Sequence, residues 1–425
     1  MRVAVFGAGY VGLVTGACFA DLGHEVVVRD IVAEKIEALL AGRVPIHEHG
    51  LEELLYRNAE RLRFTTDVGE AVDGADVVYV AVGTPPTYSG DADLSAVWTV
   101  VDELPELDRR IVVAMKSTVP VGTGRAVRHR LDDRGLANVG YVSNPEFTAE
   151  GTAVRDFMQP DRIVIGAFDL ADGDTIARLH DGIDAPIVRC DVPSAEMIKL
   201  AANAALVTRI SFINEIANVC EATGADVMTV AEGIGLDRRI GPAFLRAGIG
   251  FGGSCFPKDS LALKQLAANS GYNFQLLNAV IEVNELQKRR VVGKLERRLG
   301  PLRGKRIALL GLAFKPGTDD MREAPSLVLA GRLLSEGADV TAWDPVADGA
   351  DHLHGVEIAE TALEALDGAD AAVLVTEWPE LRELDWAGAG ERMRQRVVVD
   401  GRNFLDPDQL RALGFVYEGI GRPVL

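Results

Sequence analysis

The sequence has little of three things, and each shortage excludes a class of protein. It holds only four cysteines in 425 residues, which are Cys18, Cys190, Cys220 and Cys255. They are scattered, without paired metal-ligand spacing, so the sequence predicts no metal site and no disulfide framework. No apolar run approaches the length that spans a membrane. Basic side chains are also scarce, with 44 Lys and Arg against 63 Asp and Glu and a net charge of −19, which argues against nucleic-acid or anionic-membrane partners.

What remains is typical of a globular protein. Hydrophobic residues make up 48% and charged residues 25% of the chain, and its length suffices for two or three domains with full cores. The N-terminal residues form a strand-like run rather than a signal peptide, so we expect a soluble, cytoplasmic protein. The acidic balance still allows a phosphorylated small molecule, because a few Arg and Lys in one cleft can bind a diphosphate.

The first thirty residues carry a dinucleotide-binding pattern. Residues 2–6 read as a buried strand that leads into GAGYVG at 7–12 and then into an apolar helix through residue 22. A second strand at 25–30 ends on Asp30. An acid at this position accepts hydrogen bonds from an adenosine ribose and repels a 2′-phosphate. The pattern therefore predicts a Rossmann domain that prefers NAD to NADP.

Further strand-like runs at 76–82, 111–115 and 162–165 alternate with helical patterns. This alternation predicts an α/β fold with a mainly parallel, doubly wound sheet. The middle of the chain has two long helical stretches instead, at 196–222 and 274–298. The second is long and polar on one side, and we expect it to connect the flanking domains.

The opening pattern returns at 305–311, where KRIALLG resembles residues 2–7, but without GxGxxG. We therefore expect two Rossmann-like domains, at 1–193 and 301–425, on either side of an all-helical domain at 194–300. The second glycine turn carries LAFKPGT instead, and Lys315 with Arg322 nearby looks suited to phosphates. Solvated surface charges are the alternative for these two residues.

The stretch GFGGSCFPKD at 250–259 places Cys255 on a glycine-rich loop beside a lysine and an aspartate. Pro257 suits a first helical turn and leucines follow it, so we expect a helix to begin just after Cys255 and to face the sulfur with its N-terminus. Helix N-termini and neighbouring cations can lower the pKa of a cysteine well below its usual ~8.5. The alternative is a small buried hydrophobe, but three glycines beside a packed thiol would cost backbone entropy without adding contacts. The pattern favours a nucleophile.

The ordered motifs GAGYVG, VGTPP, STVPVGT, NPEF, EMIKLAANA, FLRAGIGFGGSCFPKD, FKPGTDDMREAPS and DGRN resemble the nucleotide-sugar dehydrogenases, the UDP-glucose/GDP-mannose dehydrogenase family. The resemblance runs from residue 1 to about residue 405, and is greatest to the branch that acts on UDP-glucose. It implies oxidation of a primary alcohol at sugar C6 to a carboxylate, with two NAD⁺ and a cysteine that forms a thiohemiacetal and then a thioester. It also implies a homodimer or higher homo-oligomer.

The resemblance assigns catalytic roles to Cys255, Lys199, Asn203, Asp259, Glu146 and Thr118. Lys199 and Asn203 stand four residues apart, which puts both on one helix face, and they are implied to stabilise oxyanions at C6. Glu146 is implied in thioester hydrolysis, and Asp259 in orienting water and the Lys199 amine. Thr118 is implied to hold a water.

The resemblance also assigns binding roles. Residues implied to bind the cofactor are Gly7, Gly9, Tyr10, Val11, Gly12, Asp30, Lys35, Thr84, Thr118, Glu150, Lys258 and Arg322. Those implied to bind the substrate are Glu146, Phe147, Thr148, Glu150, Lys199, Asn203, Arg239, Phe244, Leu245, Arg246, Ala247, Gly248, Gly252, Lys315 and Arg402.

Alternatives remain open at this stage. Thr148 stands where the family more often has leucine, which leaves the sugar less certain than the nucleotide, and GDP-mannose is the second candidate. Ser254 and Lys258 argue against the branch that oxidises N-acetylated UDP-hexosamines. A non-catalytic NAD-binding scaffold or sensor would be expected to lack at least one chemical residue, and simple hydride transfer on a hydroxy acid would have no use for Cys255.

Overall fold

The computed structural model describes residues 1–423, and the chain forms two compact units. The first comprises Met1–Ala202 and Leu261–Tyr272, and the second comprises Asn203–Ser260 and the chain from Asn273 onward. Neither unit is a continuous piece of sequence, because helices α9 (Val192–Thr223) and α11 (Phe256–Asn269) each contribute residues to both.

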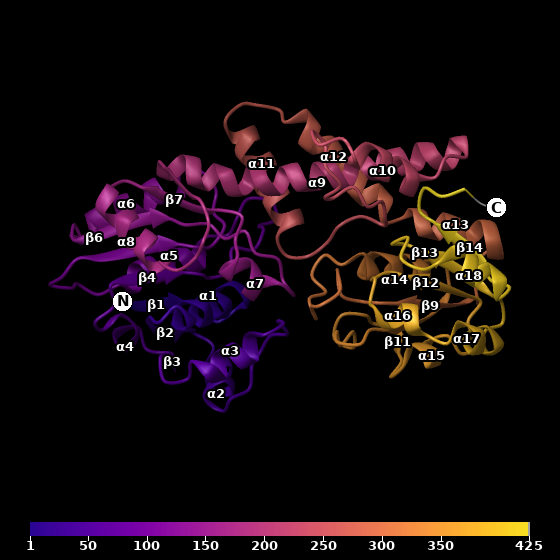
Figure 1. The fold of residues 1–425 in the computed structure, drawn as a ribbon, viewed down its shortest axis with the longest axis horizontal. Helices are drawn as coiled ribbons and strands as arrows, with labels where there is room; N and C mark the ends of the chain where they lie inside the picture. The colour runs from indigo at the N-terminus through magenta and orange to yellow at the C-terminus, as the bar shows by residue number, and fades with distance from the viewer. Residues whose placement is uncertain (424–425) are drawn as a thin grey trace. The chain divides into compact units, whose positions relative to one another are not determined.

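The first unit is built on an eight-stranded sheet, drawn in indigo to magenta in Figure 1, with the order β3-β2-β1-β4-β5-β6-β7-β8. Its strands are β1 (Arg2–Phe6), β2 (Glu25–Arg29), β3 (Leu62–Thr65), β4 (Val77–Val80), β5 (Ile111–Met115), β6 (Val139–Ser143), β7 (Ile163–Ala167) and β8 (Ile187–Cys190). Strands β1 to β6 pair in parallel, β7 is antiparallel to β6, and β8 is parallel to β7. The predicted mainly parallel sheet is confirmed, with one reversal that the sequence did not reveal.

Helices cover both faces of this sheet, as a doubly wound fold requires. They are α1 (Tyr10–Asp21), α2 (Ala33–Leu40), α3 (Leu51–Arg57), α4 (Val68–Val72), α5 (Ser95–Glu103), α6 (Thr123–Asp133), α7 (Ala153–Met158) and α8 (Leu170–Leu179). Alternate residues of β1 join separate cores: Val3 and Val5 pack with residues of α1, whereas Ala4 and Phe6 pack with residues of α5 and α6. Burial on both faces explains why the inner strands read as continuous apolar runs.

The second unit contains a six-stranded, wholly parallel sheet in the order β11-β10-β9-β12-β13-β14. Its strands are β9 (Arg306–Leu310), β10 (Asp339–Trp343), β11 (Glu357–Ile358), β12 (Ala371–Leu374), β13 (Val397–Asp400) and β14 (Val416–Gly419). This order repeats the first six strands of the other sheet, so the predicted second Rossmann-like unit is confirmed.

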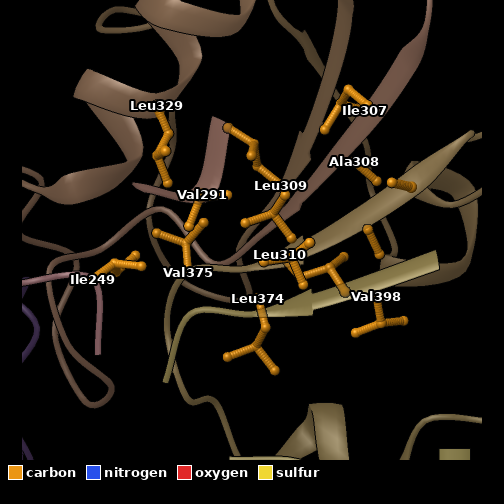
Figure 2. Packing of buried hydrophobic residues seen from close by; sticks show 14 of the residues in the cluster. Ile249, Val291, Ile307, Ala308, Leu309, Leu310, Leu329, Leu374, Val375 and Val398 are labelled. Atoms are coloured by element: carbon orange, nitrogen blue, oxygen red, sulfur yellow. The ribbon is translucent and has the colours of Figure 1, made fainter. Parts of the chain in front are cut away.

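The core of the second unit lies between its strands and the helices beside them. These helices are α10 (Val227–Gly235), α13 (Arg290–Leu299), α14 (Pro325–Ser335), α15 (Ala362–Ala365), α16 (Glu380–Glu383), α17 (Trp386–Arg392) and α18 (Pro407–Ala412). Helix α12 (Gln275–Gln287) belongs to the same unit. Figure 2 shows Val291 of α13 and Leu329 of α14 near Leu309 and Leu310 of the central strand, in one buried cluster. The loop residue Ile249 joins the same cluster, so the glycine-rich segment that follows it starts from the core.

The central region is helical, as predicted, but one detail is wrong. The stretch 274–298 is not one long connecting helix: it divides into α12 and α13, where the amides of Arg289 and Val292 bond three residues back instead of four. The helices that run from one unit into the other are instead α11 and α9, of which α9 is the longer, with 32 residues. Among the described residues, no helix is both long and apolar enough to cross a membrane.

Candidate active site

Cys255 stands at the beginning of α11. The amide of Asp259 donates to the Cys255 carbonyl at 2.8 Å, the first bond of the helix, so the predicted helix start is confirmed. The thiol is partly exposed, and the Ser254 hydroxyl lies 3.6 Å from its sulfur. A partly exposed sulfur at a helix N-terminus has the setting of a reactive cysteine. Burial raises the pKa of the thiols of Cys18, Cys190 and Cys220 instead.

The glycines before Cys255 are fixed by close packing. A Cβ on Gly252 would lie 2.3 Å from the Glu323 carbonyl oxygen, and a Cβ on Gly253 would lie 2.8 Å from the ring of Phe314. Gly250 and Gly253 also have positive φ angles of 93° and 83°, which other residues rarely adopt. Glycine is therefore required here by contacts, which corrects the expectation that these residues add no packing.

Three buried amide side chains hold the same loop, and the sequence analysis did not single them out. Asn284 accepts the Phe251 amide at 2.8 Å and donates to its carbonyl at 3.1 Å. Gln287 donates to the Gly248 carbonyl at 2.9 Å, and Asn214 accepts the Gly248 amide at 2.9 Å. A signal was present, because Asn284 and Gln287 are polar residues three positions apart on an otherwise buried face of α12.

Asn203 and Asp259 meet within the second unit. The Asn203 amide nitrogen donates to Asp259 Oδ2 at 2.6 Å, and the Lys258 ammonium lies 2.5 Å from Oδ1. Both Asn203 and Asp259 are buried, at 6% and 1% exposure. Asp259 binds Asn203 through one carboxylate oxygen and Lys258 through the other, so it fixes the orientation of the Asn203 amide. The predicted contact of Asp259 with Lys199 stays a prediction.

Lys199 and Glu146 form a buried ion pair in the first unit. The Lys199 ammonium lies 2.8 Å from Glu146 Oε1, and both side chains are almost fully buried. The other oxygen, Oε2, accepts the Thr148 amide at 2.7 Å and its hydroxyl at 2.8 Å. Burial raises the pKa of the Glu146 carboxyl, but the Lys199 charge and the hydrogen bonds outweigh it and hold the pKa below its ordinary value. Glu146 is therefore an ionised acceptor at neutral pH.

This geometry gives Thr148 a function that leucine could not supply. Its hydroxyl and amide together satisfy one oxygen of Glu146. The neighbouring Phe147 ring is covered by the Arg162 guanidinium, at 3.7 Å from the ring centre, and the Lys199 ammonium is 5.5 Å from the same ring. Side chains of the NPEF segment are thus held by contacts on several sides.

The glycine turn after β1 fits a dinucleotide. Gly7 has φ +111° and a Cβ there would meet the Ala81 carbonyl oxygen at 2.4 Å, and one on Gly12 would meet the Gly7 oxygen at 1.9 Å. Gly9 has nothing within 4 Å of its Cβ position. The first and third glycines are thus fixed by packing, whereas the second leaves open space at the first turn of α1, where Tyr10 and Val11 begin the helix.

The acid after β2 is fixed beside this turn. Asp30 accepts the Ala8 amide at 2.7 Å and the Val32 amide at 2.9 Å, and the Lys35 ammonium lies 3.8 Å from it. The predicted neighbours Thr84 and Thr118 also meet, since the Thr84 hydroxyl donates to the Thr118 carbonyl at 2.9 Å. Predicted cofactor residues thus occur together at the carboxyl ends of the strands, where open α/β sheets bind ligands.

Glu48 fixes the segment after Glu150, although none of the sequence motifs contains it. Its carboxylate accepts the Gly151 amide at 2.6 Å and the Ala153 amide at 2.9 Å. These amides lie at the start of α7. Glu48 is buried at 7% exposure, so a carboxylate distant in sequence determines the path of the chain around Glu150.

Arg402 joins the DGRN turn to the glycine loop in the second unit. Its guanidinium donates to the carbonyls of Val375 and Gly250, both at 2.8 Å. Burial lowers the pKa of Arg402, against the charge of Glu377. Asp400 begins the turn, and it accepts the Arg402, Phe404 and Leu405 amides and the Tyr417 hydroxyl.

Strained backbone marks three of the motifs. Among the described residues, those other than glycine with positive φ are Phe244 at 61°, Glu323 at 53° and Asn403 at 51°. Each lies in a motif that carried the family resemblance, and such conformations cost on the order of 1–3 kcal/mol unless the surroundings enforce them. Strain of this kind collects at ligand-binding segments.

The remaining predicted substrate residues have varied surroundings. Leu245 and Ala247 are buried, and the Arg246 guanidinium donates to the Asn403 carbonyl at 3.2 Å. Arg239 is mostly exposed and pairs with its neighbour Asp237 at 2.6 Å, so its proposed reach into another subunit stays a prediction. Lys315 lies 5.5 Å above the Phe314 ring, and Arg322 forms a close ion pair with Asp320 at 2.7 Å.

Comparison with protein families shows which family the chain belongs to. Three models match along the chain: the UDP-glucose/GDP-mannose dehydrogenase family NAD binding domain at residues 1–184, its central domain at 193–286 and its UDP binding domain at 308–407. The chain belongs to the UDP-glucose/GDP-mannose dehydrogenase family. It is therefore an NAD-dependent oxidoreductase, and the predicted family and cofactor are confirmed.

Relatives of this dehydrogenase align over its whole length. It is 46% identical to UDP-glucose 6-dehydrogenase TuaD of Bacillus subtilis, over 100% of this chain and 94% of that protein. It is 46% identical to a UDP-glucose 6-dehydrogenase of Pseudomonas aeruginosa, over 100% of this chain and 98% of that protein. A solved UDP-glucose dehydrogenase from Pyrobaculum islandicum has a TM-score of 0.92 at 39% identity, covering 99% of this chain and 98% of its own.

The dehydrogenase should lose much of its cofactor selectivity in Asp30→Asn. The substitution removes the charge that repels a 2′-phosphate while keeping an oxygen for the Ala8 amide, and it leaves Lys35 without its carboxylate neighbour. We expect the ratio of kcat/KM for NAD⁺ to that for NADP⁺ to fall about tenfold, equivalent to ~1.4 kcal/mol. Glu34→Gln, which removes an exposed charge on α2, is the matched control. An unchanged ratio in Asp30→Asn would assign selectivity to another element.

Proposed function

We propose that the protein oxidises UDP-glucose to UDP-glucuronate, with Cys255 as the nucleophile. The observation that carries this proposal is the partly exposed Cys255 at the N-terminus of α11, after a loop held by Asn284 and Gln287. The relatives named above, which act on UDP-glucose by name, support the choice of substrate. The match of residues 308–407 to a UDP binding domain supports the choice of nucleotide.

The first oxidation converts the C6 alcohol to an aldehyde. When held by the glycine turn and Asp30, NAD⁺ would supply the hydride acceptor for this oxidation and for the second. The alcohol proton passes to a base, for which we propose the neutral amine of Lys199, formed when its ammonium releases a proton. The developing charge on oxygen is then stabilised by the Lys199 ammonium and the Asn203 amide. Such a donor contributes on the order of 3 kcal/mol in a site from which water is excluded. Asp259 serves this step by fixing the Asn203 amide.

The second oxidation proceeds on the enzyme. Cys255 Sγ adds to the aldehyde carbon to form a thiohemiacetal, in which the carbonyl oxygen takes a proton. Loss of that proton and of the second hydride leaves a thioester. From the addition until hydrolysis the sugar carbon stays bonded to Sγ, so addition of Cys255 prevents release of the aldehyde. Lys199 and Asn203 again face a charged oxygen on the same carbon.

Hydrolysis completes the reaction. Water adds to the thioester carbon, the carbon–sulfur bond breaks, and the carboxylate leaves while Cys255 regains its thiolate. The net reaction consumes one alcohol, two NAD⁺ and one water, and yields one carboxylate, two NADH and three protons. We propose that Glu146, ionised at neutral pH, accepts the proton of this water. Thr118 is proposed to hold the water in place.

The proposal is tested by supplying UDP-glucose, GDP-mannose and UDP-N-acetylhexosamines separately to the purified protein with NAD⁺. We expect rapid NADH formation with UDP-glucose, at two NADH for each sugar consumed and without free aldehyde. A ratio of one with aldehyde trapped in solution would contradict the covalent route. Faster turnover of GDP-mannose would replace the proposed substrate by the second candidate, and no NADH with any of these sugars would favour a non-catalytic NAD-binding role.

The assembly and location of the enzyme are further proposals. Helix α9 exposes large apolar side chains seven residues apart, with Phe212 at 51% and Val219 at 58% exposure. This spacing puts both on one helix face, which is suited to a second copy of the chain, so we propose a homodimer. Light scattering of the parent and of Phe212→Glu would test it, since the substitution should shift the mass toward the monomer. A cytoplasmic location fits the abundance of acidic groups and the use of NAD.

A further inference from the structure

Lys116 is a buried lysine that the proposed mechanism does not use. It follows β5 directly, and Asn144 follows the neighbouring strand β6. The Lys116 ammonium donates to Asn144 Oδ1 at 3.2 Å, and its nitrogen lies 5.8 Å from the Tyr79 ring centre and 5.6 Å from that of Phe157. Its exposure is 5%. Among residues 1–423, no carboxylate is within 4.0 Å of this nitrogen.

Asn144 connects Lys116 to the NPEF segment. Its side-chain oxygen also accepts the Tyr79 hydroxyl at 3.0 Å, its side-chain nitrogen donates to the Val164 carbonyl at 2.8 Å, and its backbone amide donates to the Met115 carbonyl at 2.9 Å. Asn144 is fully buried. It stands two residues before Glu146, so the position of the carboxylate depends on this set of bonds.

A cavity of about 290 Å³ brings the lysine and the carboxylate to one space, since Lys116, Asn144 and Glu146 all line it. The titratable groups that act on Lys116 come from several elements. Glu146 follows β6, Lys199 is on α9, Cys18 is on α1, and His180 follows α8. The charged residues Arg155, Asp156, Asp161 and Arg162 line the same cavity.

We propose that Lys116 is a positioning residue for the oxidation, whose buried ammonium holds Asn144 in place and whose charge makes the proton of Lys199 easier to transfer. The proposal rests on the role proposed above for Lys199. Two like charges in a buried region oppose each other's protonation, so Lys116 counteracts the tendency of Glu146 to hold the proton on Lys199. The effect on Lys199 requires the positive charge of Lys116. A carboxylate beside Lys116 would cancel that charge.

The electrostatics of the region agree with this geometry. Burial lowers the pKa of Lys116 to about 8, with Glu146 acting to raise it and Lys199 to lower it further. Burial and the Lys116 charge lower the pKa of His180 to about 4, so the histidine adds no charge at neutral pH. The charge on Lys116 is therefore present at pH 6–7 and absent above pH 9.

Because Lys116 loses its charge as the pH rises, the loss of kcat in Lys116→Met should depend on pH. Methionine keeps the length of the side chain without its charge, so kcat should fall about tenfold at pH 6–7. The defect should narrow as the pH rises from 8 to above 9, because the parent enzyme loses the same charge there. Only the part that comes from the missing hydrogen bond to Asn144 should persist. A merely structural role would give a loss that is equal at every pH, and either that result or no loss at any pH would overturn the proposal.

Stability gives a readout that does not depend on substrate. The folded pKa of Lys116 lies below the unfolded one, so the unfolded state binds more protons and the lysine destabilises the fold below pH 8. This penalty decreases as the pH rises from 8 toward 10. Lys116→Met should therefore have an equal or higher Tm at pH 7, with the difference narrowing toward pH 10. A lower Tm at pH 7 would assign the loss of activity to misfolding.

The decisive measurement is an NMR titration of ¹³C-labelled lysine side chains, in which the Lys199 signal is assigned by its disappearance in Lys199→Met. Removal of the Lys116 charge should raise the pKa of Lys199, whatever the enzyme does to a sugar. Lys288→Met is the matched control, because Lys288 is equally buried and pairs with the half-exposed Glu285. It should leave both the Lys199 titration and the pH profile unchanged. An unshifted Lys199 in Lys116→Met would overturn the inference even if the proposed function holds.

Discussion

Replacing Cys255 by serine should abolish steady-state turnover while leaving UDP-glucose binding nearly intact. The hydroxyl keeps the size and hydrogen bonding of the thiol, but it is a poor nucleophile at neutral pH and its ester is a poorer acyl donor than a thioester. We expect kcat to fall at least about 10⁴-fold, as when other enzymes lose their nucleophile. Calorimetry with UDP-glucose would measure binding, and intact-protein mass spectrometry would reveal any slow covalent adduct.

The other cysteines provide the controls. Cys190→Ser and Cys220→Ala should keep most of the parent activity, because burial raises the pKa of both thiols and neither lies in the glycine-rich segment that carries Cys255. Cys18 is fully buried under the first sheet and can be replaced by alanine at a cost in stability alone. If Cys255→Ser turned over within a few-fold of the parent, the sulfur would not be the nucleophile, and simple hydride transfer would become the better reading.

Glu146→Gln should separate oxidation from hydrolysis. The amide cannot take a proton from water, so the thioester should accumulate and kcat should fall by about 10²–10⁴-fold, the usual effect of removing a general base. Rapid mixing with UDP-glucose should give a burst of two NADH per subunit, followed by slow turnover. The acyl-enzyme should be visible by mass spectrometry of the quenched protein.

The Glu221–Lys294 pair supplies a matched control for this substitution. It is a second carboxylate and lysine at 2.6 Å, with both side chains mostly buried, and it lies in the second unit outside the proposed site. Glu221→Gln should lower the Tm, because the buried Lys294 ammonium loses its partner at 2.6 Å and keeps only Glu418 at 3.8 Å, but it should leave kcat unchanged. The absence of a burst in Glu146→Gln would move the role of Glu146 to a step before the thioester.

Much of the fold follows from local patterns in the sequence. Buried parallel strands are continuous apolar runs, and β1 and β5 have the predicted bounds because glycine or charged residues end those runs sharply. The antiparallel β7 could not be foreseen, since Ile163–Ala167 reads the same in either direction. The division of 274–298 was also invisible, because Lys288 and Arg289 are good helix formers and the break lies in their hydrogen bonds.

The sequence predicted some of the site residues and not others, and there is a physical reason for the difference. Cys255, the glycine turn and Asp30 stand at helix and strand ends, which short patterns specify. The polar spacing on α12 could single out Asn284, but its partner and that of Glu48 could not be foreseen, because both are backbone amides distant in sequence. Lys116 escaped notice for the same reason: only the folded chain shows that it is buried beside Asn144, with no carboxylate within 4.0 Å among the described residues.

The division of the chain between the two units has a consequence for the order of folding during synthesis. The segment Leu261–Tyr272 belongs to the first unit, where Leu261 lies against Gly90, but it is made only after a long stretch of the second unit. The first unit therefore cannot be complete when its eight strands have left the ribosome. A fragment that ends at residue 202 lacks this packing, so we expect the nascent chain to wait for α11 before its N-terminal half reaches full stability.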